Sequence, residues 1–330
     1  MVLKKQASQK FKPNNLLIDI GGTNARFCLE GQDHNSVLVL PTNEYPNIEA
    51  SIFDYLKRKS INLSSIKAIA IAIANPVEGD WMSMTNHHWQ FSINQLKKTL
   101  KVPMLKVIND FVAIALSVPE LTKKDLSKIG GGTAQANGVI GVIGPGTGLG
   151  VGGLIKSNNH WIPINSEGGH TMFSPANNLE IKILNLLLAK FPHLSFERLV
   201  SGPGIELIYN SIRQIQNYNK KAFPLLSTPE IVELSQNKLS PLAIKTTEIY
   251  SEILGSFAGN LAITLGCNGG LYLGGGVLIK MKKAFNKKLF RQRFEAKGRF
   301  KKYMQKIPIY LITCKYPAFM GLAKALKQNN

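Results

Sequence analysis

Two glycine-rich turns, each placed between apolar segments of strand length, constrain the fold of this chain most. Residues 16–30 contain an apolar strand, a Gly-Gly turn and a second strand, and residues 139–155 repeat this order. Short apolar runs bounded by glycines are typical of buried strands. The repetition predicts two α/β domains with a cleft between them, which is where small ligands usually bind.

The chain length agrees with this division, since 330 residues exceed the roughly 100–150 residues of a common single domain. A lysine- and glycine-rich stretch at 122–138 interrupts the apolar pattern and is the expected linker. We expect a small domain formed by 1–120 together with 314–330, and a large domain at 121–313. Residues 1–13 are predicted to be a basic tail.

The charge is strongly positive, with 40 basic and 20 acidic residues and a formal net charge of +20. The basic residues are densest at 280–306. Such a segment either attracts a polyanion, such as nucleic acid or a nucleotide, or is a solvated helical face. Few aromatic residues are spaced to stack on bases, which favours the solvated face. We therefore expect no nucleic-acid partner.

Targeting and redox signals are sparse. No window contains the roughly 18–20 consecutive apolar residues that a membrane span requires, so no membrane association is expected, and no apolar stretch follows the basic start. Cys28, Cys267 and Cys314 lie far apart in the sequence. They form neither a CxxC pair nor a plausible disulfide framework. The expected compartment is the cytoplasm.

The first turn, residues 19–26, reads Asp-Ile-Gly-Gly-Thr-Asn-Ala-Arg. Paired glycines let the backbone approach an anion closely, and N–H groups of such a turn can surround phosphate oxygens. A carboxylate just before the turn can hold a hydrated magnesium ion. An ordinary hairpin is the alternative, but the complete string with its Asp and Arg favours phosphate binding. The candidate residues are Asp19, Gly21, Gly22, Thr23 and Asn24.

The second turn, residues 144–150, reads Gly-Pro-Gly-Thr-Gly-Leu-Gly and can also surround phosphates. Its candidate residues are Gly144, Gly146, Thr147 and Gly148. The spacing at 148–153 also matches the dinucleotide-binding fingerprint, which requires a helix directly after the glycines. Residues 149–155 instead predict the first strand of a hairpin, so a nicotinamide enzyme is not expected. A P-loop motif is also missing from the sequence.

Two further segments suggest nucleotide and phosphoryl chemistry. A triple glycine at 274–276 follows a short strand and can let an adenosine lie against the backbone, with Gly275 as the candidate residue. Asn109 and Asp110 lie where a strand meets a helix. Asp110 is predicted either to cap the helix or to accept the proton of a hydroxyl that attacks a phosphoryl group. Asn109 can bind neighbouring hydroxyls.

Polar residues that suit sugar hydroxyls follow. Glu167 and His170 are separated by two glycines in a predicted loop, and Glu197 lies in a Ser-Phe-Glu-Arg segment. Carboxylate and imidazole groups can bind adjacent hydroxyls in bidentate patterns. Glu167 with His170 would also suit half of a metal site, but no further His or Cys pair in the sequence completes it.

Taken together, these strings resemble bacterial glucokinase, of the hexokinase/actin-like ATPase superfamily. They occur in the family's order with similar spacing, from about residue 16 to the C-terminal helix. The Thr-Asn-His-x-Trp, Glu-Gly-Gly-His and Ser-Gly-Pro-Gly strings are the most specific. The matching segments are 19–26, 75–89, 108–111, 144–150, 167–170 and 197–204.

The resemblance implies an actin-like, ribonuclease-H-like fold of two α/β domains that close over a sugar, with the C-terminal helix completing the small domain. It implies transfer of a phosphoryl group from ATP to the 6-hydroxyl of glucose, with Asp110 as the catalytic base. The other sugar contacts would be Asn86, Asn109, Glu167, His170 and Glu197. Both glycine turns would contact the ATP phosphates, and Gly275 the adenosine. Mg²⁺ would accompany ATP, close to Asp19 through water, and a homodimer is a further family-level expectation.

The departures from the family pattern are modest. They are the basic tail, the strong positive charge, and the residues Ser166, Thr171 and Met172 beside the Glu-Gly-Gly-His loop. Three alternatives stay open: a sugar-responsive repressor of the repressor/ORF/kinase family, a non-catalytic sugar sensor of the same fold, and a kinase for another hexose. Polyphosphate is conceivable as a donor because of the basic segment, but ATP is the expected one.

Overall fold

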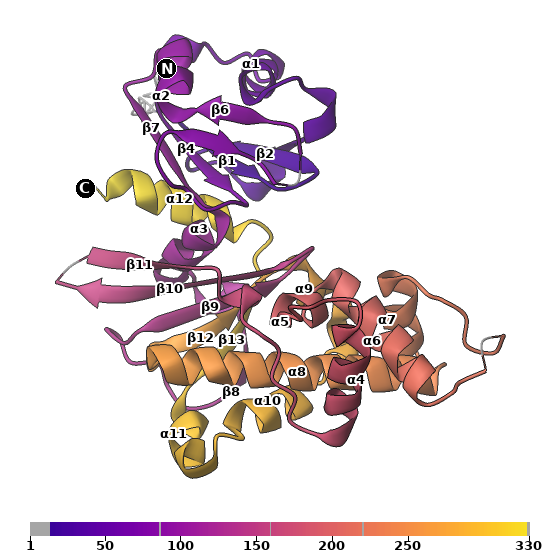
Figure 1. Ribbon diagram of the computed structural model, residues 1–330. Coiled ribbons are helices and arrows are strands. Elements are labelled where there is room, and N and C mark those ends of the chain that lie inside the picture. The colour runs from indigo at the N-terminus through magenta and orange to yellow at the C-terminus, as the bar shows by residue number, and fades with distance from the viewer. Residues whose placement is uncertain (1–13, 86, 159, 220, 329–330) are drawn as a thin grey trace, which may run out of the picture. The chain divides into compact units, whose positions relative to one another are not determined.

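The computed structural model describes residues 14–328, except 86, 159 and 220. The chain divides into two compact units (Figure 1). The first contains the residues up to Ala113 and those from Ala318 onward, and the second is Ile114–Pro317.

The first unit is built on a five-stranded sheet in the order β3-β2-β1-β4-β7. These strands are β1 (Asn14–Ile20), β2 (Asn24–Leu29), β3 (Leu38–Pro41), β4 (Ile66–Ile73) and β7 (Met104–Asn109). β1, β2 and β3 pair antiparallel, whereas β4 and β7 continue the sheet parallel to β1. β4 is buried at every position except Lys67, as expected for a parallel strand covered on both faces.

Helices and a small two-stranded sheet complete this unit. They are α1 (Ile48–Arg58), α2 (Ile93–Leu100), the first part of α3 (Asp110–Ser117), most of α12 (Pro317–Lys327), β5 (Trp81–Ser83) and β6 (Gln90–Ser92). α1 and α2 contribute Ile52 and Leu96 to one core with the large sheet. α12 packs closely on α3, because a Cβ at Gly321 would lie 1.7 Å from the Ala113 carbonyl oxygen.

The second unit repeats the strand order of the first. Its sheet runs β11-β10-β9-β12-β13-β8, with β9, β10 and β11 antiparallel and β12 and β13 parallel to β9. The predicted repetition of strand, glycine turn and strand is therefore confirmed. The strands are β8 (Leu126–Gly130), β9 (Ile140–Pro145), β10 (Leu149–Ser157), β11 (His160–Ser166), β12 (Gly270–Leu273) and β13 (Ile309–Ile312).

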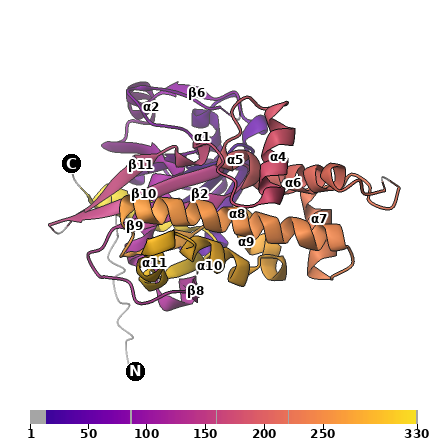
Figure 2. The same cartoon turned by 60° about the horizontal axis from the view of Figure 1, so that its bottom comes forward.

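Eight helices, with bounds as follows, accompany this sheet in the described part of the unit: α4 (Asn178–Leu188), α5 (Phe196–Leu199), α6 (Gly202–Ile215), α7 (Thr228–Gln236), α8 (Pro241–Leu265), α9 (Gly276–Met281), α10 (Lys287–Glu295) and α11 (Lys301–Lys306). α8 runs from its Ser240 cap to Gly266, which has φ 67°, a backbone region that favours glycine. α10 lies along α8 (Figure 2). Gly255 permits this approach, since a Cβ there would lie 2.3 Å from the Phe290 carbonyl oxygen.

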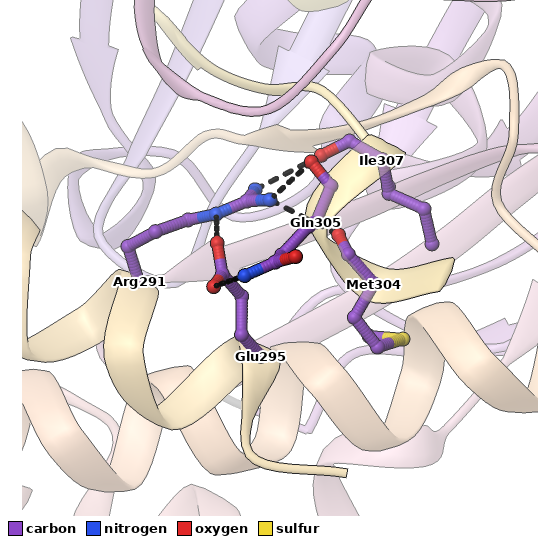
Figure 3. A network of polar contacts seen from close by, with 5 residues as sticks. All are labelled: Arg291, Glu295, Met304, Gln305 and Ile307. Atoms are coloured by element: carbon purple, nitrogen blue, oxygen red, sulfur yellow. Dashed lines mark hydrogen bonds and ion pairs between the residues drawn. The ribbon is translucent and has the colours of Figure 1, made fainter. Parts of the chain in front are cut away.

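A polar network around Arg291 joins α10 to the end of α11 and to Ile307, which directly follows α11 (Figure 3). The Arg291 Nε atom pairs with Glu295 at 2.6 Å. Its two terminal nitrogens donate to the carbonyl oxygens of Met304, Gln305 and Ile307 at 2.9–3.0 Å. Carbonyl oxygens at the end of a helix lack hydrogen-bond donors within it. The Arg291 guanidinium supplies such donors at the end of α11.

The interpretation of residues 122–138 as a linker is wrong. The segment contains β8, which pairs antiparallel with β13 at the edge of the second sheet. Its glycines serve close packing, since Gly131 has φ +87° and a Cβ there would lie 2.0 Å from the Ile307 carbonyl oxygen. Among the residues that the structure describes, no helix combines the length and apolar character needed to cross a membrane.

Candidate active site

The first glycine turn joins β1 to β2 as a hairpin. Gly21 N–H donates to the Asn24 carbonyl oxygen at 3.0 Å, and the Thr23 carbonyl accepts from Thr42 N–H at 3.0 Å. A Cβ at Gly21 would meet no atom closer than 3.6 Å. Packing within the hairpin therefore does not demand glycine at position 21, and a ligand could approach the backbone there.

Asp19, at the end of β1, forms an ion pair with Arg26 on β2 at 2.9 Å. Burial raises the pKa of the Asp19 carboxyl, and the Arg26 guanidinium partly offsets this effect. Mg²⁺ usually keeps several waters and takes one or two carboxylates with substrate phosphates. A single carboxylate beside a glycine turn fits that pattern. Within the described ranges, no three His, Cys, Asp or Glu residues cluster in a way that could hold a metal ion.

The strand register brings the other candidates of the first unit to the same edge of the sheet. Ile20 on β1 is opposite Ile73 on β4, and Ile73 is opposite Asn109 on β7. The glycine turn and Asp110 therefore both follow the carboxyl ends of parallel strands, where ligands bind in α/β sheets.

Asn109, rather than Asp110, caps α3. The Asn109 Oδ1 atom accepts from the backbone N–H groups of Phe111 at 2.8 Å and Val112 at 3.2 Å. Asp110 is the first residue of the helix, is half-buried, and accepts from Phe111 N–H at 2.9 Å. The predicted capping role of Asp110 is therefore wrong, because the preceding residue already performs it.

Asn75 is a residue that the sequence reasoning did not single out as part of the site. Its Oδ1 atom accepts from Thr85 N–H at 3.2 Å, and its Nδ2 atom donates to the Ser83 carbonyl at 3.1 Å. Its own carbonyl accepts from the Asn109 side chain at 3.2 Å. Asn75 thus ties the segment that leads to position 86 to Asn109. Its place at the start of the 75–89 string was the available signal, and the candidate Asn86 lies outside the described residues.

The second glycine turn joins β9 to β10, so the dinucleotide fingerprint is followed by a strand, as predicted. Gly146 N–H donates to the Gly148 carbonyl, and the Gly146 carbonyl accepts from Gly202 N–H, both at 2.8 Å. A Cβ at Gly146 would meet no atom within 4 Å. Gly275, at φ +83°, lies against the same turn, where a Cβ would come 2.3 Å from the Pro145 carbonyl oxygen.

Glu197 connects this turn to the Glu-Gly-Gly-His loop. Its Oε2 atom accepts from Leu149 N–H at 2.9 Å, and its Oε1 atom lies 3.9 Å from His170 Nδ1. A Cβ at Gly148 would lie 2.5 Å from the Glu197 carboxylate, and one at Gly169 would lie 2.1 Å from the Leu149 carbonyl oxygen. The second unit therefore gathers the turn at 144–148, the loop at 167–170 and Glu197.

The unusual residues beside the loop support its backbone. Ser166 Oγ accepts from Gly168 N–H at 3.0 Å, and Thr171 Oγ1 donates to the Gly168 carbonyl at 2.8 Å. Glu167 follows β11 and its carbonyl accepts from His170 N–H at 3.0 Å. The side chain of His170 is 59% exposed, which leaves it accessible to a ligand.

Comparison with known proteins identifies the family. The glucokinase family model matches residues 16–329. The chain is 46% identical to the "Bifunctional protein glk" of Burkholderia orbicola over 98% of its own length and 50% of that protein, so it spans about half the length of that curated relative. It is 42% identical to a glucokinase of Neisseria meningitidis serogroup C, over 94% of each chain.

Solved structures agree. A glucokinase from an Antarctic psychrotroph has a TM-score of 0.84 and 30% identity, with 96% of this chain and 100% of that chain covered. A ROK family glucokinase from Streptomyces griseus, solved with glucose and AMPPNP, shares the fold at a TM-score of 0.64 and 17% identity, with 96% and 100% covered. The predicted actin-like ATPase fold is confirmed, and the chain belongs to the glucokinase family.

Proposed function

We propose that this chain transfers the γ-phosphoryl group of ATP to the 6-hydroxyl of glucose, giving glucose 6-phosphate and ADP. Membership of the glucokinase family supports the reaction. The observation that supports Asp110 as the base is its position. It is the first residue of α3 and directly follows β7, so its carboxylate stands at the carboxyl end of a parallel strand.

In this proposal Asp110 accepts the proton of the 6-hydroxyl as the oxygen attacks phosphorus. Asn86 and Asn109 contact the sugar from the first unit, and Glu167, His170 and Glu197 bind the remaining hydroxyls from the second. Such contacts hold the sugar so that only one hydroxyl is aligned with the phosphoryl group. The proposal requires that residues of both units act on the same pair of substrates, and the predicted cleft between the domains stays a prediction.

The two glycine turns would hold the triphosphate. In each turn a glycine, Gly21 or Gly146, leaves space where a Cβ would otherwise stand, so a phosphate can come close to the backbone. Gly275 lies next to the second turn for the adenosine. Mg²⁺, bound with ATP, would offset negative charge on the phosphate oxygens. Asp19 is the residue that would hold its water shell. The cytoplasmic compartment, the homodimer and the lack of a nucleic-acid partner stay predictions.

A coupled assay of ADP release with glucose, mannose and fructose tests the reaction and its specificity. We expect kcat/KM to be highest for glucose. We expect Asp110→Asn and Asp110→Ala to lower kcat by about 10²–10⁴-fold while the melting temperature is retained. Asp33→Asn, in an exposed turn of the same unit, is the matched control and should turn over normally.

Near-normal turnover of Asp110→Asn would overturn the assignment of the base. A wild-type chain that binds glucose in equilibrium dialysis but releases no ADP would support the non-catalytic sensor instead. A higher kcat/KM with mannose or fructose than with glucose would show that the other hexose is the preferred substrate.

A further inference from the structure

We propose that the second unit carries a separate binding site for a small organic phosphate. The site is a cavity of about 980 Å³ formed by the end of α7, the first half of α8 and the segment that links α9 to α10. Its position uses none of the residues assigned to glucose or ATP. The inference therefore does not depend on the proposed kinase activity.

The charge of the cavity wall favours an anion. Lys238, Lys282, Lys283 and Lys287 line it, against Glu248 as the acidic residue of the lining. All four lysines are exposed, so their ammonium groups can reach a ligand from solvent. Lysine binds phosphate as a mobile point charge, and several lysines around one cavity suit a doubly charged phosphate ester.

The floor of the cavity is apolar. Leu278, Phe285 and Leu311 line it from the core, and Ile279, which is 44% exposed, lines it at the surface. A bare inorganic ion would leave Ile279 in water, whereas an organic group would cover it. The combination of lysines at the edge and aliphatic side chains beneath them points to an ester of phosphate with an apolar body.

The start of α10 adds a second favourable feature for an anion. Asn286 and Lys287 line the cavity, and α10 begins at Lys287 with Asn286 as its cap, accepting from Leu289 N–H at 3.1 Å. The N-terminal end of a helix carries partial positive charge and attracts phosphate groups.

The backbone around the cavity includes one unfavourable conformation. Lys282 has φ 44° and ψ −114°, a region that residues other than glycine rarely adopt. Gln236 holds the segment in place, since its Nε2 atom donates to the carbonyl oxygens of Lys280 at 3.2 Å and Met281 at 3.1 Å. Strained residues persist where neighbours fix them, and they concentrate at ligand sites.

The site is distinct from the expected nucleotide site along α9. Gly275 directly precedes α9, whereas the cavity is lined from Leu278 onward and by the residues that follow the helix. A ligand in the cavity would contact the carboxyl end of α9, while adenosine is expected at its amino end.

Methyl NMR on the full chain tests binding directly. The protein carries ¹³C-labelled isoleucine δ1 methyl groups and is saturated with a non-hydrolysable ATP analogue, so that the nucleotide site is occupied. The probe is 1-naphthyl phosphate, and the comparison compounds are 1-naphthol and inorganic phosphate. We expect 1-naphthyl phosphate to shift the methyl signals of Ile244 and Ile279, which line the cavity, and not that of Ile181 on α4.

The three compounds separate charge from apolar contact. We expect inorganic phosphate and 1-naphthol each to bind at least about tenfold more weakly than 1-naphthyl phosphate, because each lacks one of the two kinds of contact. Equal affinity for 1-naphthyl phosphate and inorganic phosphate would mean that the cavity binds an adventitious ion only, and would contradict the proposal. No shift at Ile279 would overturn the proposal.

Matched lysine variants test the location. Lys283→Ala with Lys287→Ala removes two charges from the cavity, and Lys301→Ala with Lys302→Ala removes two exposed charges of the same basic segment outside it. We expect about tenfold weaker binding for the first pair and less than about twofold for the second. Lys238→Ala, on a different segment, repeats the test if the first pair is poorly folded. Equal weakening by both pairs would mean general attraction to positive charge and would contradict a built site.

Discussion

The Oε2 atom of Glu197 accepts a hydrogen bond from the backbone N–H of Leu149 across 2.9 Å. Leu149 lies in the glycine-rich segment 144–150, which is expected to hold phosphate, and the other carboxylate oxygen of Glu197 lies near His170. One side chain predicted to bind sugar is therefore also attached to the predicted nucleotide turn.

Substitutions at Glu197 should separate these two attachments. Glu197→Gln keeps a carbonyl oxygen for Leu149 N–H but removes the charge, so we expect the KM for glucose to rise about tenfold with little change in the KM for ATP. Glu197→Ala removes both attachments and should raise both KM values. Steady-state kinetics with each substrate varied measures the difference, and identical KM values for ATP in the two variants would contradict the role of the Leu149 contact.

Gly146 and Gly148 form a second matched pair. A Cβ at Gly146 would enter open space, whereas one at Gly148 would lie 2.5 Å from the Glu197 carboxylate. We expect Gly146→Ala to keep its melting temperature and to raise the KM for ATP by about tenfold, because the methyl group would occupy the approach of a phosphate. Gly148→Ala should displace the Glu197 side chain and weaken the binding of glucose as well as that of ATP. An unchanged KM for ATP in Gly146→Ala would remove the second turn from the nucleotide site.

Asn109 should contribute to stability as well as to the sugar site. Loss of an N-cap costs about 1 kcal/mol, so Asn109→Ala should lower the free energy of unfolding by that amount. Asn109→Asp retains an oxygen that accepts from Val112 N–H and should restore stability, but it loses the amide donor and should still bind glucose more weakly. Urea unfolding and the KM for glucose test the two effects, and equal stability of the two variants would argue against the cap.

Tyr55 should make the first unit sensitive to alkaline pH. Its hydroxyl is buried without a hydrogen-bond partner among the described residues, and burial raises its pKa from 10.0 to about 12. The unfolded chain therefore loses this proton first, and stability falls as pH rises from 10 towards 12, by about 1 kcal/mol at pH 11. Tyr55→Phe should remove that part of the pH dependence.

The same substitution has an expected effect at neutral pH. The Tyr55 ring stacks on Phe27 with centroids 5.2 Å apart, and phenylalanine retains this contact while removing the unpaired hydroxyl. Tyr55→Phe should therefore leave stability unchanged or raise it by up to about 1 kcal/mol. Tyr45→Phe is the contrast, since the Tyr45 hydroxyl donates to Asp54 at 2.5 Å, and its loss should destabilise. A large loss of stability in Tyr55→Phe would show that its hydroxyl has a partner.

An element can be predicted from the sequence when the residues that specify it lie within that element. The apolar run of β4, the capped helix α8 and the strand after the second glycine turn were all predictable, because period, caps and glycine position are written into short segments. The glycine strings also indicated the phosphate turns, and the family resemblance supplied roles for the polar residues.

Features that depend on distant partners were not predictable in this way. β8 has few apolar residues and becomes a strand by pairing with β13, which lies far along the chain. Asn75 and Asn109 are adjacent in space because β4 and β7 pair in register. Asn and Asp are both good N-cap residues, so residue preference alone could not show whether Asn109 or Asp110 caps α3. The side-chain geometry in the folded protein decides it.

The Arg291 guanidinium changes what the basic segment means for a binding partner. Its donors are engaged by backbone oxygens and Glu295, and its side chain is only 12% exposed. A polyanion arriving from solvent would meet the lysines around it, whereas Arg291 is occupied in holding the end of α11 against α10. Replacing it to reduce surface charge would remove these internal contacts, so a count of positive residues overstates the charge that a partner can reach.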